Sequence, residues 1–154
     1  MKIDDLISLE AIIPNLKASN KKQALQELAE RAARIVGIDA RLIFDVLLER
    51  ELLGTTGVGQ GVAIPHGKLA QLDRLYGVFA RLEHAIDFES IDDQPVDLFF
   101  LLLAPEGAGA DHLKALAKVS RLLRNKAVCE KLRGSESADA IFALLLEAST
   151  PNAA

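Results

Sequence analysis

The stretch that most restricts the fold is residues 95–105, PVDLFFLLLAP, a nearly unbroken apolar run between two prolines. Successive side chains of a strand point to opposite faces of its sheet, so a strand that is apolar at every position must be buried on both faces. The run is much shorter than the roughly 20 residues that a membrane-spanning helix needs. It therefore predicts a central strand in a sheet that helices cover on both faces.

Size, charge and cysteine content narrow the class of protein. The chain has 154 residues, enough for one domain with a hydrophobic core. Its 18 Lys and Arg residues against 22 Asp and Glu residues give a net charge of −4, which does not support a nucleic-acid or membrane-surface partner. The single cysteine, Cys129, argues against an intramolecular disulfide and a Cys-based zinc site. We expect one cytoplasmic domain over residues 1–154, without membrane insertion and with a short flexible tail from about residue 149.

Hydrophobic periodicity predicts helices before and after the strands. Ser19 or Asn20 is a suitable cap for a helix that runs to about Val36 and ends at Gly37, and Asp39 is a suitable cap for a second helix. Three more helices are expected near the end of the chain, over about 111–123 with Asp111 as the cap, 128–133 and 137–148.

Several short segments between these helices have strand patterns. They are the apolar stretch 62–65, the alternating stretch 75–82, a short partner at 85–88, and the central run 95–105. The expected fold class is α/β (α+β), with a single sheet of about five strands flanked by helices on both faces. Strand directions stay open at this point, although consecutive strands without an intervening helix favour antiparallel pairs.

His66 is the leading candidate for chemistry. It lies between Pro65, which fixes its own φ and restricts Ile64 to extended geometry, and Gly67, which lets the backbone turn or approach a bound group. A histidine presented at such a strand exit is a nucleophile when its imidazole is neutral. The local sequence favours this interpretation and an idle loop histidine about equally.

Other residues fit phosphoryl chemistry. Arg50 carries a permanent forked cation in the last turn of the second predicted helix, and His112 lies at the start of a later one. The loop LGTTGVGQG combines the hydroxyls of Thr55 and Thr56 with glycines, as a phosphate cradle does, but lacks the lysine of a nucleotide-binding P-loop. Each feature has a plainer alternative: Arg50 neutralises its helix end, the glycines only shape turns, and His112 is solvated.

The remaining polar residues suggest no metal or cofactor site. His84 fits the edge of a hairpin, and Cys129 fits a small buried side chain. Asp92, Asp93 and Asp97 fit turn and strand-start positions, and their spacing matches no metal-ligand pattern.

Several segments in order resemble one known family. The run RELLGTTGVGQGVAIPHGK, residues 50–68, resembles the active-site signature of the mannitol/fructose class of enzyme IIA domains in the bacterial phosphotransferase system. The segments IDDQPVDLFFLLLAPEG and DHLKALAKVSRLL extend the resemblance over nearly the whole chain. Within that class, the sequence is most similar to the nitrogen-regulatory enzyme IIA.

This resemblance implies a function and roles for particular residues. His66 would be the phosphoacceptor, with His112 and Arg50 beside it. Phosphoryl-binding positions would be Thr55, Thr56, Gly59 and Gly67. The family implies a mixed sheet flanked by helices, no cofactor, and a phosphorylated HPr-like carrier protein as the phosphoryl donor. The protein would then be a phosphotransferase component that acts mainly as a regulatory phosphocarrier, with targets such as sensor kinases or potassium transporters.

Two alternatives remain at this point. A free-standing fructose/mannitol-type enzyme IIA would pass its phosphoryl group to a IIB component for sugar uptake. A non-catalytic module would use the surroundings of His66 only to bind an anion.

Overall fold

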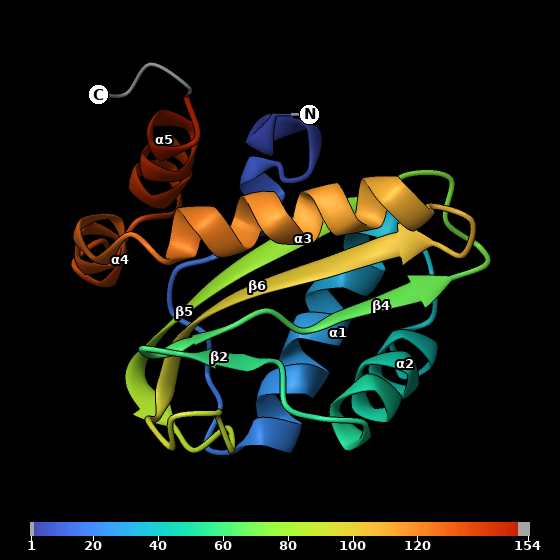
Figure 1. Ribbon diagram of the computed structural model, residues 1–154, viewed down its shortest axis with the longest axis horizontal. Coiled ribbons are helices and arrows are strands. Elements are labelled where there is room, and N and C mark those ends of the chain that lie inside the picture. Colours follow the sequence, from blue (N-terminus) through green and yellow to red (C-terminus); the bar gives the residue numbers. More distant parts are fainter. Residues whose placement is uncertain (1, 151–154) are drawn as a thin grey trace.

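Six strands form one mixed sheet in the computed structural model, which describes residues 2–150 (Figure 1). The order is β1 (Ile12–Ile13), β5 (Tyr76–Ile86), β6 (Val96–Pro105), β3 (Val62–Ala63) and β2 (Gly57–Gly59), and β4 (His66–Leu69) also pairs with β6. The β5/β6 and β2/β3 pairs are antiparallel, whereas β1/β5, β3/β6 and β4/β6 are parallel. The expected mixed sheet is confirmed, with six strands.

The predicted central strand is β6, and it is the core of the sheet. Its five residues 98–102 are all fully buried, because β5 lies along one edge and β3 with β4 along the other. Helices cover both faces of the sheet, which explains why the sequence of β6 is apolar at successive positions instead of alternating between apolar and polar residues.

β3 and β4 follow the same edge of β6 in a single register. Val62 pairs with Leu98 and His66 pairs with Leu102, so the paired residues of both strands differ by the same distance in sequence from their partners on β6. The interruption falls at Ile64 and Pro65, where proline has no N–H to donate to the ladder. His66 therefore begins β4, whereas the sequence pattern placed it at the exit of the preceding strand.

Helices cover both faces of the sheet. α1 (Lys21–Val36) packs on β5 and α2 (Ala40–Leu52) packs on β4, while α3 (Gly109–Leu123) lies across the opposite face on β6 (Figure 1). α4 (Lys126–Arg133) and α5 (Ala138–Ala148) follow α3, and two short 3-10 turns, Ile3–Asp5 and Leu9–Ala11, precede β1. The predicted caps are confirmed at Asn20 and Asp39, whose side chains accept hydrogen bonds from backbone N–H groups of the first turn.

Some predicted boundaries differ from the structure. α3 has Ala108 at its N-cap, and Asp111 lies in its first turn; the turn that follows Pro105 leads directly into the helix, so no side-chain cap is used. The stretch 85–88 is not a separate strand, because β5 continues to Ile86. The predicted tail lies, from residue 151 on, outside the described residues. Within residues 2–150, none of the helices combines the length and the apolar character that crossing a bilayer requires.

Candidate phosphoryl-transfer site

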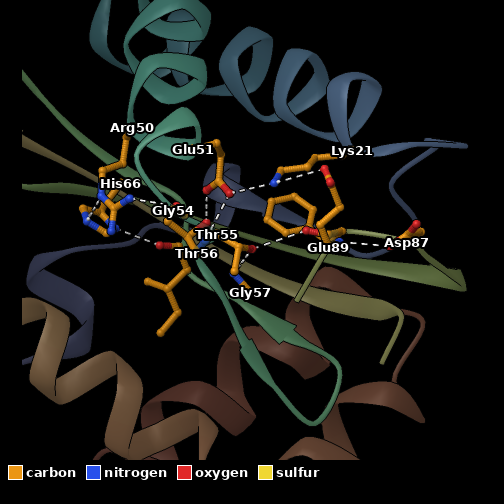
Figure 2. Close-up of polar contacts among 12 residues, drawn as sticks. Lys21, Arg50, Glu51, Gly54, Thr55, Thr56, Gly57, His66, Asp87 and Glu89 are labelled. Atoms are coloured by element: carbon orange, nitrogen blue, oxygen red, sulfur yellow. Dashed lines mark hydrogen bonds and ion pairs between the residues drawn. The ribbon is translucent and has the colours of Figure 1, made fainter. Parts of the chain in front are cut away.

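His66 is held by a hydrogen bond at each ring nitrogen. Its Nδ1 lies 2.9 Å from the carbonyl oxygen of Ile64, and its Nε2 lies 3.2 Å from Nε of Arg50 (Figure 2). A carbonyl only accepts and an arginine Nε–H only donates, so Nδ1 carries the proton and Nε2 presents its lone pair. The arrangement fixes one neutral tautomer of His66, with Nε2 as its nucleophilic atom.

The surroundings of His66 favour the neutral ring. Partial burial lowers the pKa of His66 below its ordinary value of 6.5, and the positive charge of Arg50 adds to this effect. The hydrogen bond to Ile64 and the charge of Glu51 act in the opposite direction but are outweighed. At neutral pH the lone pair on Nε2 is therefore available for attack on phosphorus.

Arg50 reaches His66 from the last turn of α2. Its Nη1 donates to the carbonyl oxygen of Gly54 at 2.9 Å, which fixes the guanidinium plane against the loop after the helix. Within residues 2–150, no salt bridge joins Arg50 to an acidic side chain. The structure thus places a cation that lacks a carboxylate partner against the nucleophilic nitrogen of His66.

His112 approaches His66 from α3, which covers the face of the sheet opposite to α2. It lies in the first turn of α3, and the two imidazole centroids are 5.6 Å apart at an interplanar angle of 67°. The side chain is buried, and its Nε2 has no hydrogen-bond partner among the described residues. Burial lowers the pKa of His112, and His66 and Lys68 lower it further. A neutral His112 with an unpaired nitrogen can bond to a group that enters beside His66.

The predicted hydroxyl ligands are turned into their own loop. The Thr55 hydroxyl donates to the Phe88 carbonyl at 3.4 Å and accepts from the Gly57 N–H at 3.0 Å. The Thr56 hydroxyl donates to the Glu51 carboxylate, and the Thr56 side chain is buried (Figure 2). In this structure both hydroxyls shape the loop, and neither forms a hydrogen bond to His66.

The two predicted glycine ligands lie in different surroundings. Gly67 follows His66 in β4 and therefore faces the other side of the sheet, where a Cβ would lie 2.5 Å from Cγ1 of Val46 on α2. Gly59 has a φ of 102° and lies beside the Asp92 carboxylate at the far end of β2. Close helix packing explains the first glycine, and a left-handed backbone explains the second.

Glu51 is the residue that the sequence analysis missed. It follows Arg50 in α2, and its side chain is only 3% exposed. Its carboxylate accepts from the backbone N–H and the hydroxyl of Thr56 and forms a salt bridge with Lys21 at 3.0 Å. An acid next to an arginine at a helix end ordinarily indicates solvent exposure, and only its position within the apolar stretch LLERELLG hints at burial.

The acidic residues considered for a metal serve other purposes. Asp92 accepts from the backbone N–H groups of Gln60 and Gln94, and Asp97 forms a salt bridge with Arg133. Within residues 2–150, no three His, Cys, Asp or Glu side chains gather as a metal site requires.

Comparisons with known proteins identify the family. The family model for the phosphoenolpyruvate-dependent sugar phosphotransferase system, EIIA 2, matches residues 5–148. The chain is 63% identical over 145 residues to a nitrogen regulatory protein of Bradyrhizobium diazoefficiens, covering 94% of this chain and 95% of the relative. It is 41% identical over 143 residues to a fructose-specific EIIA component of Haloferax volcanii, covering 93% and 90% of the two chains.

The solved structures agree with this assignment. The crystal structure of the nitrogen regulatory protein IIA-Ntr from Neisseria meningitidis superimposes with a TM-score of 0.88 at 35% identity, covering 93% of this chain and 98% of that one. The chain belongs to the EIIA type 2 family of the phosphoenolpyruvate-dependent sugar phosphotransferase system, and it is most like the nitrogen-regulatory members.

Proposed function

We propose that this protein is a histidine phosphocarrier of the nitrogen-type phosphotransferase system. It accepts a phosphoryl group on Nε2 of His66 from a phosphorylated HPr-like carrier, and its phosphorylation state regulates partner proteins. The observation that carries the proposal is the tautomer of His66, in which Nδ1–H is bound to Ile64 and the Nε2 lone pair faces Arg50. The family assignment supports the reaction class.

The transfer needs no metal and no proton relay. The phosphorus–nitrogen bond of the donor phosphohistidine breaks as the bond from phosphorus to Nε2 of His66 forms, and the electron pair of the broken bond returns to the donor ring. Nδ1 of His66 keeps its proton throughout. Arg50 moves from the lone pair to the phosphoryl oxygens, where its fork of donors compensates their charge. Beside this dianion His112 gains a proton or donates its own N–H.

The surface around the site suits a protein donor. Leu52 and Leu53 directly follow the arginine-bearing turn and are 79% and 83% exposed, and Leu113, next to His112, is 68% exposed. Large apolar side chains exposed together around a reactive group are typical of docking surfaces for another protein. The negative net charge of the chain and this apolar rim both fit a small carrier better than a free polyanionic substrate.

Phosphorylation of the purified protein tests the proposal directly. Incubation with phosphoenolpyruvate, the matching enzyme I and its HPr-like carrier should give a phosphate that is labile in acid and stable in base. The His66→Ala variant should accept none, and His84→Ala, which removes an exposed histidine of β5, should accept phosphate as the wild type does. Phosphate retained by His66→Ala would refute the assignment. Failure of the wild type with every carrier would favour the anion-binding module.

The regulatory role has a sugar-transport alternative, which the 41% identity to a fructose-specific EIIA component favours. In that case phosphorylated His66 passes its phosphoryl group to a IIB component. Transfer to purified fructose- or mannitol-type IIB protein distinguishes the two roles. A regulatory phosphocarrier should transfer little to IIB but should retain kinases or potassium-transport proteins in a pull-down that differs between His66→Ala and His66→Asp.

A further inference from the structure

The buried carboxylate of Glu51 has several hydrogen-bond and ionic partners. Its Oε1 lies 3.0 Å from both the Thr56 backbone nitrogen and Nζ of Lys21, and its Oε2 accepts from the Thr56 hydroxyl (Figure 2). A buried carboxylate is costly unless it is paired and hydrogen-bonded, and here both conditions are met. The position of Glu51 is therefore tightly determined by Lys21 of α1 and by the loop that follows α2.

One chain of hydrogen bonds leads from Glu51 to Nδ1 of His66. Glu51 fixes Thr56, whose carbonyl oxygen accepts from the Ile64 N–H at 2.9 Å. The carbonyl oxygen of Ile64 then accepts from Nδ1–H of His66. Only two residues, Thr56 and Ile64, separate the carboxylate from the ring nitrogen whose proton defines the tautomer.

A second connection leads from Glu51 to Nε2 of His66. The backbone carbonyl of Glu51 accepts from the Gly54 N–H at 3.1 Å, and the Gly54 carbonyl accepts from Nη1 of Arg50 at 2.9 Å. The same guanidinium donates through Nε to His66. Both hydrogen bonds of the imidazole thus involve the loop after α2. The carboxylate of Glu51 holds this loop at Thr56, whereas the bond at Gly54 comes from the backbone of residue 51 and does not depend on its side chain.

We propose that Glu51 is a positioning residue that sets the tautomer and orientation of the His66 ring, with Lys21 holding it in place. This inference rests on His66 being the phosphoacceptor. Glu51 does not touch the ring, and its carboxylate acts through Thr56 and Ile64. If its role were only structural, replacing it would lower stability and leave the ring nitrogens of the folded protein unchanged.

Two substitutions of Glu51 test the length of its side chain and its charge separately. Glu51→Asp keeps the charge but is one methylene shorter, so it loses contact with either Thr56 or Lys21. Glu51→Gln keeps the length and an oxygen that accepts from Thr56, but it loses the charge that pairs with Lys21. Glu89→Gln is the matched control, because Glu89 is 78% exposed and contacts Lys21 only at 3.8 Å.

The three readouts are the ring ¹⁵N resonances of His66, its pKa, and its single-turnover rate of phosphorylation. Glu51→Asp should mix the two ring tautomers and slow transfer by about 10- to 100-fold, since small displacements of a reacting group have costs of this size. Glu51→Gln should keep the tautomer but, without the pairing to Lys21, should slow transfer, by less than Glu51→Asp does. It should also lower the pKa of His66, because the negative charge of Glu51 raises it. Glu89→Gln should match the wild type in all three measurements.

The outcomes distinguish this inference from the proposed function. Wild-type resonances, pKa and rates in folded Glu51 variants would overturn the positioning role, even if their melting temperatures fell. If Glu51→Asp does not fold, an unchanged rate in Glu51→Gln overturns it as well, because a changed pKa of His66 would follow from the lost charge alone. If the wild type accepts no phosphate, the proposed function fails, but the ring resonances, which need no phosphate, still decide the role of Glu51.

Discussion

Two arginines in this molecule end helices in the same way but differ in what compensates their charge. Arg133, in the last turn of α4, donates through Nε to both carboxylate oxygens of Asp97 at 2.9 Å and through Nη2 to the Gln60 carbonyl at 2.8 Å. Arg50, in the last turn of α2, likewise donates to a loop carbonyl, but its Nε–H is directed to the neutral ring of His66.

The difference separates a stabilising arginine from a reactive one. The charge of Arg133 is neutralised inside the structure, and what this residue contributes is the attachment of α4 to the sheet. The charge of Arg50 meets no carboxylate within residues 2–150, so in the proposed reaction the incoming phosphoryl group is its first anionic partner. The charge of the partner, rather than the residue type or the helix position, marks the functional site.

The largest effect is expected from Arg50→Lys. A lysine ammonium cannot hold the Gly54 carbonyl and stabilise phosphoryl oxygens with one planar fork, so the rate of phosphorylation should fall roughly 10²-fold. Because the lysine keeps the charge, the free energy of unfolding should change by less than about 1 kcal/mol. Rapid-quench transfer assays and urea unfolding measure the two quantities. An unchanged rate would place Arg50 in the same class as Arg133.

Arg133→Met should have the opposite profile. It leaves the Asp97 carboxylate and the Gln60 carbonyl without their donor, and both side chains of the pair are only partly exposed. The expected loss is about 1–2 kcal/mol of unfolding free energy, with the rate of phosphorylation unchanged.

A double-mutant cycle with Asp97→Asn measures the part of this loss that belongs to the pair. A slower transfer in folded Arg133→Met protein would contradict the proposed separation of the two arginines.

The smallest expected effect is a pH dependence of the unfolding free energy, which comes from the two histidines near Arg50. Burial is the main cause that lowers the pKa values of His66 and His112 below their ordinary value of 6.5. Below pH 6.5 the unfolded chain then binds more protons than the folded one. The contribution of the two histidines to the unfolding free energy should therefore be constant above pH 6.5, and it should decrease as the pH is lowered toward the folded-state pKa values.

Urea unfolding between pH 8 and pH 5 tests this expectation. A variant with both histidines replaced by asparagine should lose the histidine-dependent part of the slope. The same slope in that variant would show that the two rings do not cause it.

Local patterns account for the parts of the fold that were predicted correctly. Asn20 and Asp39 cap their helices with bonds to N–H groups two or three residues away, so their effect can be read from a short window. The central strand was also recognisable, because burial on both faces removes every polar residue from its middle.

Long-range pairing accounts for what was missed. β1 has two residues and β4 contains a histidine, a glycine and a lysine, so neither has a strand pattern of its own. Each becomes a strand because an edge of β5 or β6 is available to it. The parallel directions likewise follow from the path of the whole chain, which no short window contains.

The site likewise contains residues that the sequence suggested and one that depends on a long-range contact. His66, Arg50 and His112 meet as the resemblance implied, because three segments far apart in the sequence converge there. The role of Glu51 depends on Lys21, which lies on another helix, and a carboxylate at a helix end gives no sign of such a partner. Sequence patterns identified the residues that we propose to react, but not the residue that we propose to position them.

The hydrogen bond between His66 and Ile64 also protects an edge of the sheet. The carbonyl of Pro65 accepts from Leu102 on β6, so the backbone groups of Ile64 point away from β6, at the place where β2, the last strand on that side, begins. Outward-pointing groups of this kind are where a strand of another molecule can add and start aggregation. Here the Ile64 N–H is taken by Thr56 and its carbonyl by the imidazole, so the bond that orients the reactive ring also removes a place for another chain to pair.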